Sequence, residues 1–235
     1  FSSFHPFLLI SFGLAWCILR LYFFLPERMG VVFGQITGNH PLFFLAVYAP
    51  AIAAFILVAR HGGVTGLRRY LGRVLLWRCS LAWYAFLIIG VPLIFIAGSA
   101  LKGNLLTTPF PFASFQALFE ALFLAAIKGP IEEFGWRGLL QPLVQRHMAP
   151  FWAAIVVGLI WAVWHLPAFV LGGTPQAAWE FMPFFAGSVA CSMILTALFN
   201  NAHGRILLAM LFHFQMNNPL CPDAQPYDIY VYVGA

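Results

Sequence analysis

Long apolar runs occupy most of this sequence, and only short polar stretches separate them. A helix needs roughly 20 mostly apolar residues to cross the hydrocarbon core of a bilayer. Runs that reach or approach this length lie at 6–25, 41–59, 81–100, 113–127, 149–170 and 181–199, with a shorter one at about 204–218. Only 8% of the residues are charged, against about a quarter in a soluble domain. The sequence therefore predicts an all-α, polytopic transmembrane helix bundle of about seven to eight helices.

No polar block is long enough to fold separately, so we expect residues 1–235 to form a single integral membrane domain. The first apolar run has no basic lead-in and no small-residue cleavage site, which favours a membrane span over a signal peptide. The four cysteines are scattered and form no CxxC pair. Neither a disulfide framework nor a zinc ribbon is therefore indicated.

Basic residues gather between the second and third apolar runs, at Arg60, Arg68, Arg69, Arg73 and Arg78. Such residues favour the cytoplasmic side of a membrane. Alternation along the chain then predicts an integral protein of the cytoplasmic membrane with a cytoplasmic N-terminus. Leucine and arginine recur at helical spacing in segment 66–78, which predicts an interfacial amphipathic helix. Topology and contact with anionic membrane lipid thus account for the net charge of +5, with no nucleic-acid partner.

The stretch KGPIEEFGWRGLL, Lys128–Leu140, crowds charges into an apolar region. The Gly-Pro pair predicts that a helix starts at residue 130. On that helix Glu133 and Arg137 are four residues apart and can pair, while Glu132 lies about 100° round and points elsewhere. One carboxylate would then be neutralised and the other left free. The alternative is an ion-pair cluster where the helix meets the headgroups.

Two further polar clusters lie in other predicted helices. In WAVWH, Trp161 and His165 share a helix face, and in HFQMN, His213 and Asn217 do the same. Taken singly, each cluster could be a satisfied polar group or a hydrogen bond between helices. Facing helices of a bundle can, however, bring such groups together with a carboxylate at one site.

One carboxylate, two imidazoles and a carboxamide are enough to hold a water molecule for hydrolysis. Glu132, His165 and His213 could bind one divalent metal such as zinc. Glu132 could equally act as a general base on water without a metal. The HExxH signature is absent, so both possibilities stay open.

The motifs EEFGWR, WAVWH and HFQMN, in this order and at membrane depth, resemble those of the CPBP family of intramembrane proteases. This family, also called the ABI family, includes CAAX prenyl endopeptidases of the Rce1 type and many bacterial relatives. The motif-bearing core spans residues 113–218. The resemblance implies an intramembrane endopeptidase that acts on a membrane-associated or prenylated-type peptide or protein.

The resemblance also implies a role for each motif residue. Glu132, with help from His165, would activate the water. His213 and Asn217 would orient the water and stabilise the oxyanion. Three supporting residues are expected beside them, namely Glu133, Arg137 and Trp161. Trp161 departs from the family pattern, which usually has phenylalanine there, and its larger indole would narrow the cavity.

Two other classes of function remain open from the sequence. One is a non-catalytic membrane immunity or binding protein with the same fold. The other is a small transporter or proton relay in which Glu120, Glu132 and His165 carry protons, although no repeated halves are found. At the C-terminus, DIYVYVGA is predicted to begin a further span.

Overall fold

The computed structural model describes residues 3–103, 105 and 114–222. These residues are mostly helical, and no strand occurs among them, which confirms the predicted all-α bundle. In chain order the helices and turns are α1 (Phe4–Phe24), α2 (Pro26–Phe33), α3 (Pro41–Val47), α4 (Ala49–Leu71), η1 (Gly72–Leu75), α5 (Leu81–Ala85), η2 (Phe86–Gly90), α6 (Val91–Leu101), α7 (Phe115–Ile127), α8 (Gly129–Gly135), η3 (Trp136–Leu140), α9 (Gln141–Gln145), α10 (Pro150–Trp164), α11 (Leu166–Phe169), η4 (Pro175–Ala178), α12 (Phe181–Asn201) and α13 (Leu207–Met216).

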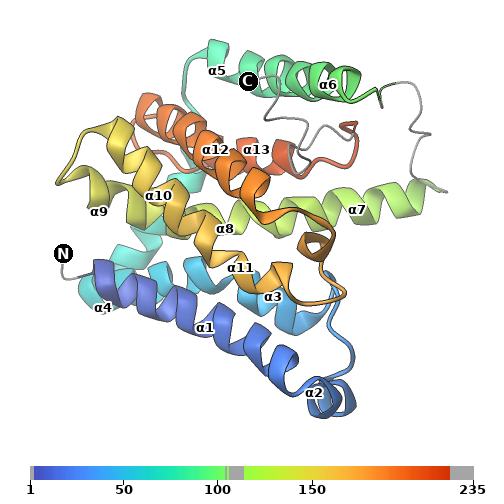
Figure 1. Ribbon diagram of the computed structural model, residues 1–235. Coiled ribbons are helices and arrows are strands. Elements are labelled where there is room, and N and C mark those ends of the chain that lie inside the picture. Colours follow the sequence, from blue (N-terminus) through green and yellow to red (C-terminus); the bar gives the residue numbers. More distant parts are fainter. Residues whose placement is uncertain (1–2, 104, 106–113, 223–235) are drawn as a thin grey trace.

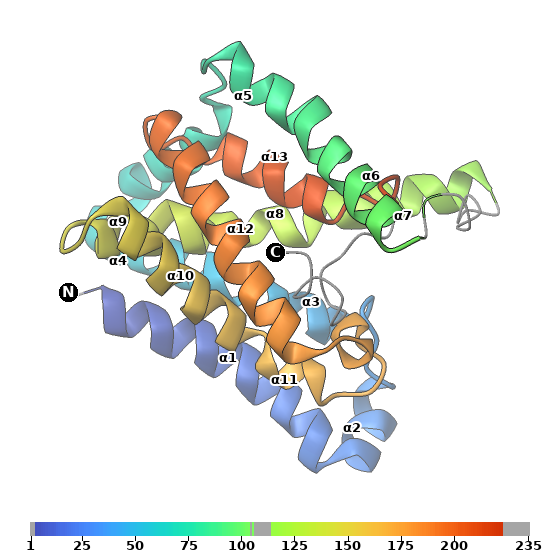
Figure 2. The same cartoon turned by 45° about the horizontal axis from the view of Figure 1, so that its top comes forward.

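The helix that carries the charged motif passes through the middle of the bundle (Figure 1). Helix α8 packs against α4 and α13, and its continuation η3 contacts α10 and α12. Around this centre α1 pairs with α3 and α4, and α10 pairs with α12 along its length (Figure 2). Residues 129–145 are therefore enclosed by other helices rather than placed against lipid.

Four helical segments in the described part are long and apolar enough to cross a membrane: Phe4–Phe24, Ala49–Leu75, Leu81–Leu101 and Phe181–Asn201. They confirm three predicted spans. They correct the predicted span at 41–59, because the helix breaks at Tyr48 and continues as α4 far beyond residue 59. The predicted segment 66–78 lies mostly within α4 and η1.

The other predicted spans are too short to cross alone. Helix α10 has 15 residues, or about 22 Å at 1.5 Å per residue, because the helix breaks at His165 just before Pro167. Helix α7 has 13 residues and α13 has 10. Residue 113 of the predicted fourth span, and the whole predicted C-terminal span, lie outside the described residues. Helices α10 and α13 each bury several residues against their neighbours, whereas Ala125 is the one buried residue of α7.

The crossing of α10 and α12 depends on a glycine. A Cβ added to Gly158 would lie 2.8 Å from Cα of Val189 and 2.9 Å from Cβ of Ser192. Nearby, the Ser192 hydroxyl donates to the carbonyl of Ala154 over 2.8 Å. The small residue thus lets the two backbones approach, as is common between membrane helices.

We predict that Gly158→Ala lowers the stability of the purified protein by about 1–3 kcal/mol, because the added methyl overpacks this crossing. Thermal unfolding in detergent measures the change. Gly13→Ala in α1 is the matched control, since nothing lies within 4 Å of the position its Cβ would take. Equal unfolding temperatures for the two variants would contradict this account of the crossing.

Candidate active site

Helix α8 begins with Gly129 and Pro130. The glycine does more than separate α8 from α7, because it also makes room for side chains of α13. A Cβ on Gly129 would lie 2.3 Å from Nδ2 of Asn217 and 2.6 Å from Nε2 of His213. Only glycine therefore lets α13 bring these two polar side chains against the start of α8. Both lie on the same side of α13, as their spacing predicted.

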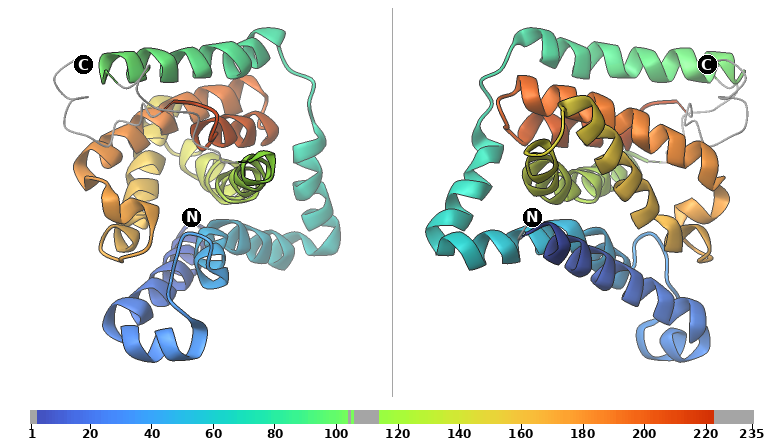
Figure 3. Two further views of the ribbon diagram at one scale, coloured as in Figure 1. Left: turned by 90° about the vertical axis from the view of Figure 1, so that its right-hand side faces the viewer. Right: turned by 60° about the vertical axis from the view of Figure 1, so that its left-hand side comes forward.

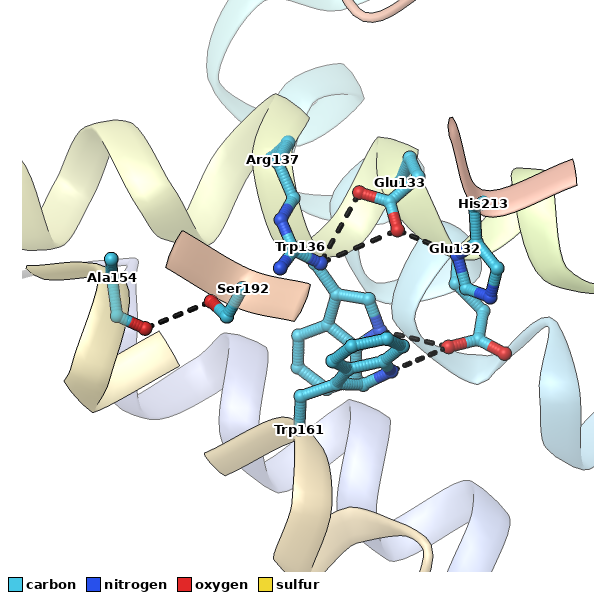
Figure 4. Close-up of polar contacts among 8 residues, drawn as sticks. All are labelled: Glu132, Glu133, Trp136, Arg137, Ala154, Trp161, Ser192 and His213. Carbon is cyan, nitrogen blue, oxygen red and sulfur yellow. Dashed lines mark hydrogen bonds and ion pairs between the residues drawn. The ribbon is translucent and has the colours of Figure 1, made fainter. Parts of the chain in front are cut away.

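The Glu132 carboxylate is held by two indoles. Its Oε2 accepts hydrogen bonds from Nε1 of Trp136 and from Nε1 of Trp161, each over 3.0 Å. Figure 4 shows both indole nitrogens meeting at this one oxygen, while the second oxygen points away from them. The side chain is 4% exposed and makes no ion pair within the described part of the chain. One carboxylate oxygen is thus fixed and the other is left facing the cavity.

Glu133 points in a different direction from Glu132, as predicted, and is fully buried. One of its carboxylate oxygens lies 2.7 Å from Nδ1 of His213. Nη1 of Arg137 lies 3.3 Å from each carboxylate oxygen. The guanidinium also stacks 5.1 Å from the ring centre of Trp161. The pairing with Arg137 follows the predicted spacing, while the bond to His213 was not predicted.

His165 lies where α10 ends, and the backbone fixes its ring. Its Nδ1 lies 2.8 Å from the carbonyl oxygen of Trp161, and a carbonyl can only accept, so Nδ1 carries a proton. A neutral imidazole then leaves Nε2 as an acceptor. Edge-on contacts with Trp161, Trp164 and Phe184, at ring-centre distances of 4.8–5.7 Å, hold the ring from three sides.

The predicted catalytic residues Glu132, His165, His213 and Asn217 all line one cavity of about 1010 Å³. Trp161 stands between the two histidines, with ring centres 5.7 Å from His165 and 5.4 Å from His213. The wall around them is mostly apolar and includes Leu19, Phe43, Phe95, Leu124 and Phe184. Three motifs from different helices therefore converge on one space, as a single site requires.

The ligand set predicted for a metal does not form a compact group. Within residues 3–103, 105 and 114–222, no three His, Cys, Asp or Glu side chains lie close enough to hold a metal ion. Glu132, His165 and His213 line one cavity without forming such a group.

Glu120 lies apart from this site. Its side chain is exposed on α7, where Oε1 accepts a hydrogen bond from Nε2 of Gln116 over 2.9 Å. It does not line the cavity. The proton relay considered from the sequence, with Glu120 leading to Glu132 and His165, therefore has no support in the arrangement of these side chains.

Sequence reasoning missed two residues of the site. Trp136 is fully buried and donates to Glu132, and its position four residues after Glu132 on the helix was the available signal. Gly129 was interpreted only as part of a helix break, although its lack of a side chain admits His213 and Asn217.

Comparison with known proteins bears directly on this arrangement. Residues 113–218 match the family model described as "Type II CAAX prenyl endopeptidase Rce1-like". This segment holds every predicted catalytic and supporting residue. Residues 113–218 are thus similar to the CPBP family, as their motifs indicated.

Individual members are similar over part of their length. CAAX prenyl protease 2 of Methanococcus maripaludis is 28% identical over 146 residues, which cover 54% of this chain and 54% of that protein. Lysostaphin resistance protein A of Staphylococcus aureus strains Newman and USA300 is 40% identical over 87 residues, which cover 37% of this chain and 19% of those proteins. The matches thus span about half of the first relative and a fifth of the others.

We predict that Arg137→Leu destabilises the protein by about 3–5 kcal/mol, because it leaves Glu133 buried without its cation. The double variant Glu133→Gln/Arg137→Leu removes both charges and should lose less stability than Arg137→Leu alone. Chemical denaturation in detergent measures both, with the exposed Arg146→Leu as control. A double variant as unstable as the sum of its single changes would contradict the pairing.

Proposed function

We propose that this protein is an intramembrane endopeptidase of the CPBP family that hydrolyses a peptide bond with a water activated by Glu132, without a metal. The observation that carries the proposal is the convergence of Glu132, His165, His213 and Asn217 on one largely apolar cavity. In such surroundings fixed polar groups act more strongly on a reacting centre than they would in water.

The free oxygen of Glu132 takes a proton from the water, whose oxygen then attacks the carbonyl carbon of the peptide bond. Nε2 of His165 faces the same cavity as an acceptor and helps to orient the water. When the tetrahedral intermediate collapses, the carbon–nitrogen bond breaks and Glu132 returns the proton to the leaving amine. One water is consumed and two peptides are released.

His213 and Asn217 position the water and stabilise the oxyanion. The bond from Nδ1–H of His213 to Glu133 directs Nε2 toward Gly129 and the cavity. Nδ2 of Asn217 lies at the same place and is the amide donor for the developing negative charge. Glu133 and Arg137 act indirectly, by fixing the ring of His213.

The apolar wall of the cavity suits a membrane-associated or prenylated-type peptide or protein as substrate. The proposed setting is the cytoplasmic membrane, with the N-terminus and the basic segment 60–78 on the cytoplasmic side. Membrane lipid and the peptide or protein substrate are the partners this function requires.

We predict that Glu132→Gln abolishes cleavage, because the amide cannot accept the proton of the water. The measurement compares peptide termini in membranes from cells that carry the wild type or the variant. Glu120→Gln is the matched control, since Glu120 is an exposed carboxylate on the preceding helix that does not line the cavity. Termini that persist unchanged in Glu132→Gln would favour the non-catalytic immunity or binding function instead.

We predict that Trp136→Phe lowers kcat roughly tenfold with little change in KM. The phenylalanine keeps an aromatic ring in the core but removes one donor to a charged group, at a cost of about 1.5–3 kcal/mol. Trp136 does not line the cavity, so substrate binding should be spared. Steady-state kinetics on a cleaved peptide give the test, and a higher KM at unchanged kcat would contradict this role for the indole.

A further inference from the structure

Helix α4 is kinked, so its second half runs in a different direction from its first half. Gly63 has φ +59° and ψ −161°, a backbone conformation that only glycine adopts readily. Figure 3 shows the helix turning a corner here and running across to the start of α5. The part after Gly63 leads toward Leu81–Leu101, which is long and apolar enough to cross a membrane. Because the kink turns this part away from the apolar first half of α4, it can lie along one membrane face.

The outer side of this segment suits a charged membrane surface. The exposed arginines are Arg60, Arg68, Arg69 and Arg78. Exposed apolar side chains accompany them at Val64 (84% exposed), Leu75 (78%) and Trp77 (63%). The sequence has no acidic residue between Glu27 and Glu120, so no neighbouring carboxylate along the chain balances these charges. Basic and apolar groups together are typical of helices that lie among anionic headgroups.

The inner side of the same segment holds the helix of the active site. The hydroxyl of Tyr70 donates to the carbonyl of Phe134. Nη1 of Arg73 donates to the carbonyl of Gly138 over 2.9 Å, and its Nε donates to the carbonyl of Gly204 over 3.0 Å. Pro142 has no N–H to offer the Gly138 carbonyl, and Arg73 donates to this carbonyl from η1.

These contacts join the basic segment to the helix that carries Glu132. Phe134 and Gly138 flank Trp136 and Arg137, which hold Glu132 and Glu133 respectively. A Cβ added to Gly138 would lie 2.2 Å from Oη of Tyr70. The two segments therefore fit closely and cannot move independently without breaking buried hydrogen bonds.

We propose that segment 64–78, together with Arg60, is a docking surface for the headgroups of anionic phospholipids. Binding there stabilises the helix that carries Glu132, through Tyr70 and Arg73. Any effect of lipid on peptide cleavage rests on the proposed function, whereas lipid binding and its effect on stability do not.

The first test measures thermal unfolding of the full chain in nanodiscs of phosphatidylcholine, with or without phosphatidylglycerol. We expect phosphatidylglycerol to raise the unfolding temperature of the wild type by about 2–4 °C. Arg68→Gln/Arg69→Gln should lose most of this rise. Arg28→Gln, which changes an exposed arginine on α2, should keep it. An equal rise in the double variant would overturn the proposal.

A second arm separates lipid from free phosphate. Glycerol phosphate added to the phosphatidylcholine nanodiscs should leave the unfolding temperature unchanged, because a membrane surface supplies several headgroups at once. A rise equal to that given by phosphatidylglycerol would show a site for soluble phosphate and overturn the lipid assignment.

A third arm tests the link to the active-site helix. Tyr70→Phe keeps the ring but removes the hydrogen bond to Phe134, and it leaves the arginines in place. Native mass spectrometry should show that this variant retains phosphatidylglycerol as the wild type does, with a smaller gain in unfolding temperature. An undiminished gain would overturn the coupling. These readouts need no substrate, so they stay interpretable if the protein proves not to cleave peptides.

Discussion

The contact among Glu133, Arg137 and His213 sets the geometry of the whole centre. A fully buried carboxylate is costly unless it is paired and hydrogen-bonded. Arg137 supplies the pairing charge from the same helix, and His213 supplies a hydrogen bond from α13. Satisfying Glu133 therefore ties α13 to α8 and turns the other imidazole nitrogen toward the cavity. The close approach that this needs is possible because residue 129 is glycine.

The two adjacent glutamates differ because the helix points them at different neighbours. Glu133 lies next to a cation, so its charge is neutralised where it stands. Glu132 lies 100° round the helix and meets two neutral indole donors that share one of its oxygens. Hydrogen bonds from neutral groups hold the carboxylate without cancelling its charge. A base needs this combination of fixed position and retained basicity.

The sequence predicted the helical fold, a helix for the charged motif and the four residues that line the cavity. These follow from apolar runs and i, i+4 spacing, which are local properties. The sequence-based predictions were wrong or incomplete where tertiary contacts determine the helix bounds and the side-chain partners. Residues 41–59 and 149–170 were apolar enough to span, but breaks at Tyr48 and His165 changed their bounds. The link between His213 and Glu133 joins positions 80 residues apart, and no local pattern encodes it. The contacts of Tyr70 and Arg73 with the active-site helix were not predicted either, because they also join residues far apart in the sequence.

The most direct test of the account is an experimental structure that resolves ordered water in the cavity. The account predicts one water within hydrogen-bond distance of the free oxygen of Glu132 and of Nε2 of His165, with His213 and Asn217 beside it. It also predicts that both indoles remain bonded to the other oxygen of Glu132. A cavity in which Glu132 turns away from the histidines, or in which Glu132, His165 and His213 all coordinate one metal ion, would contradict it.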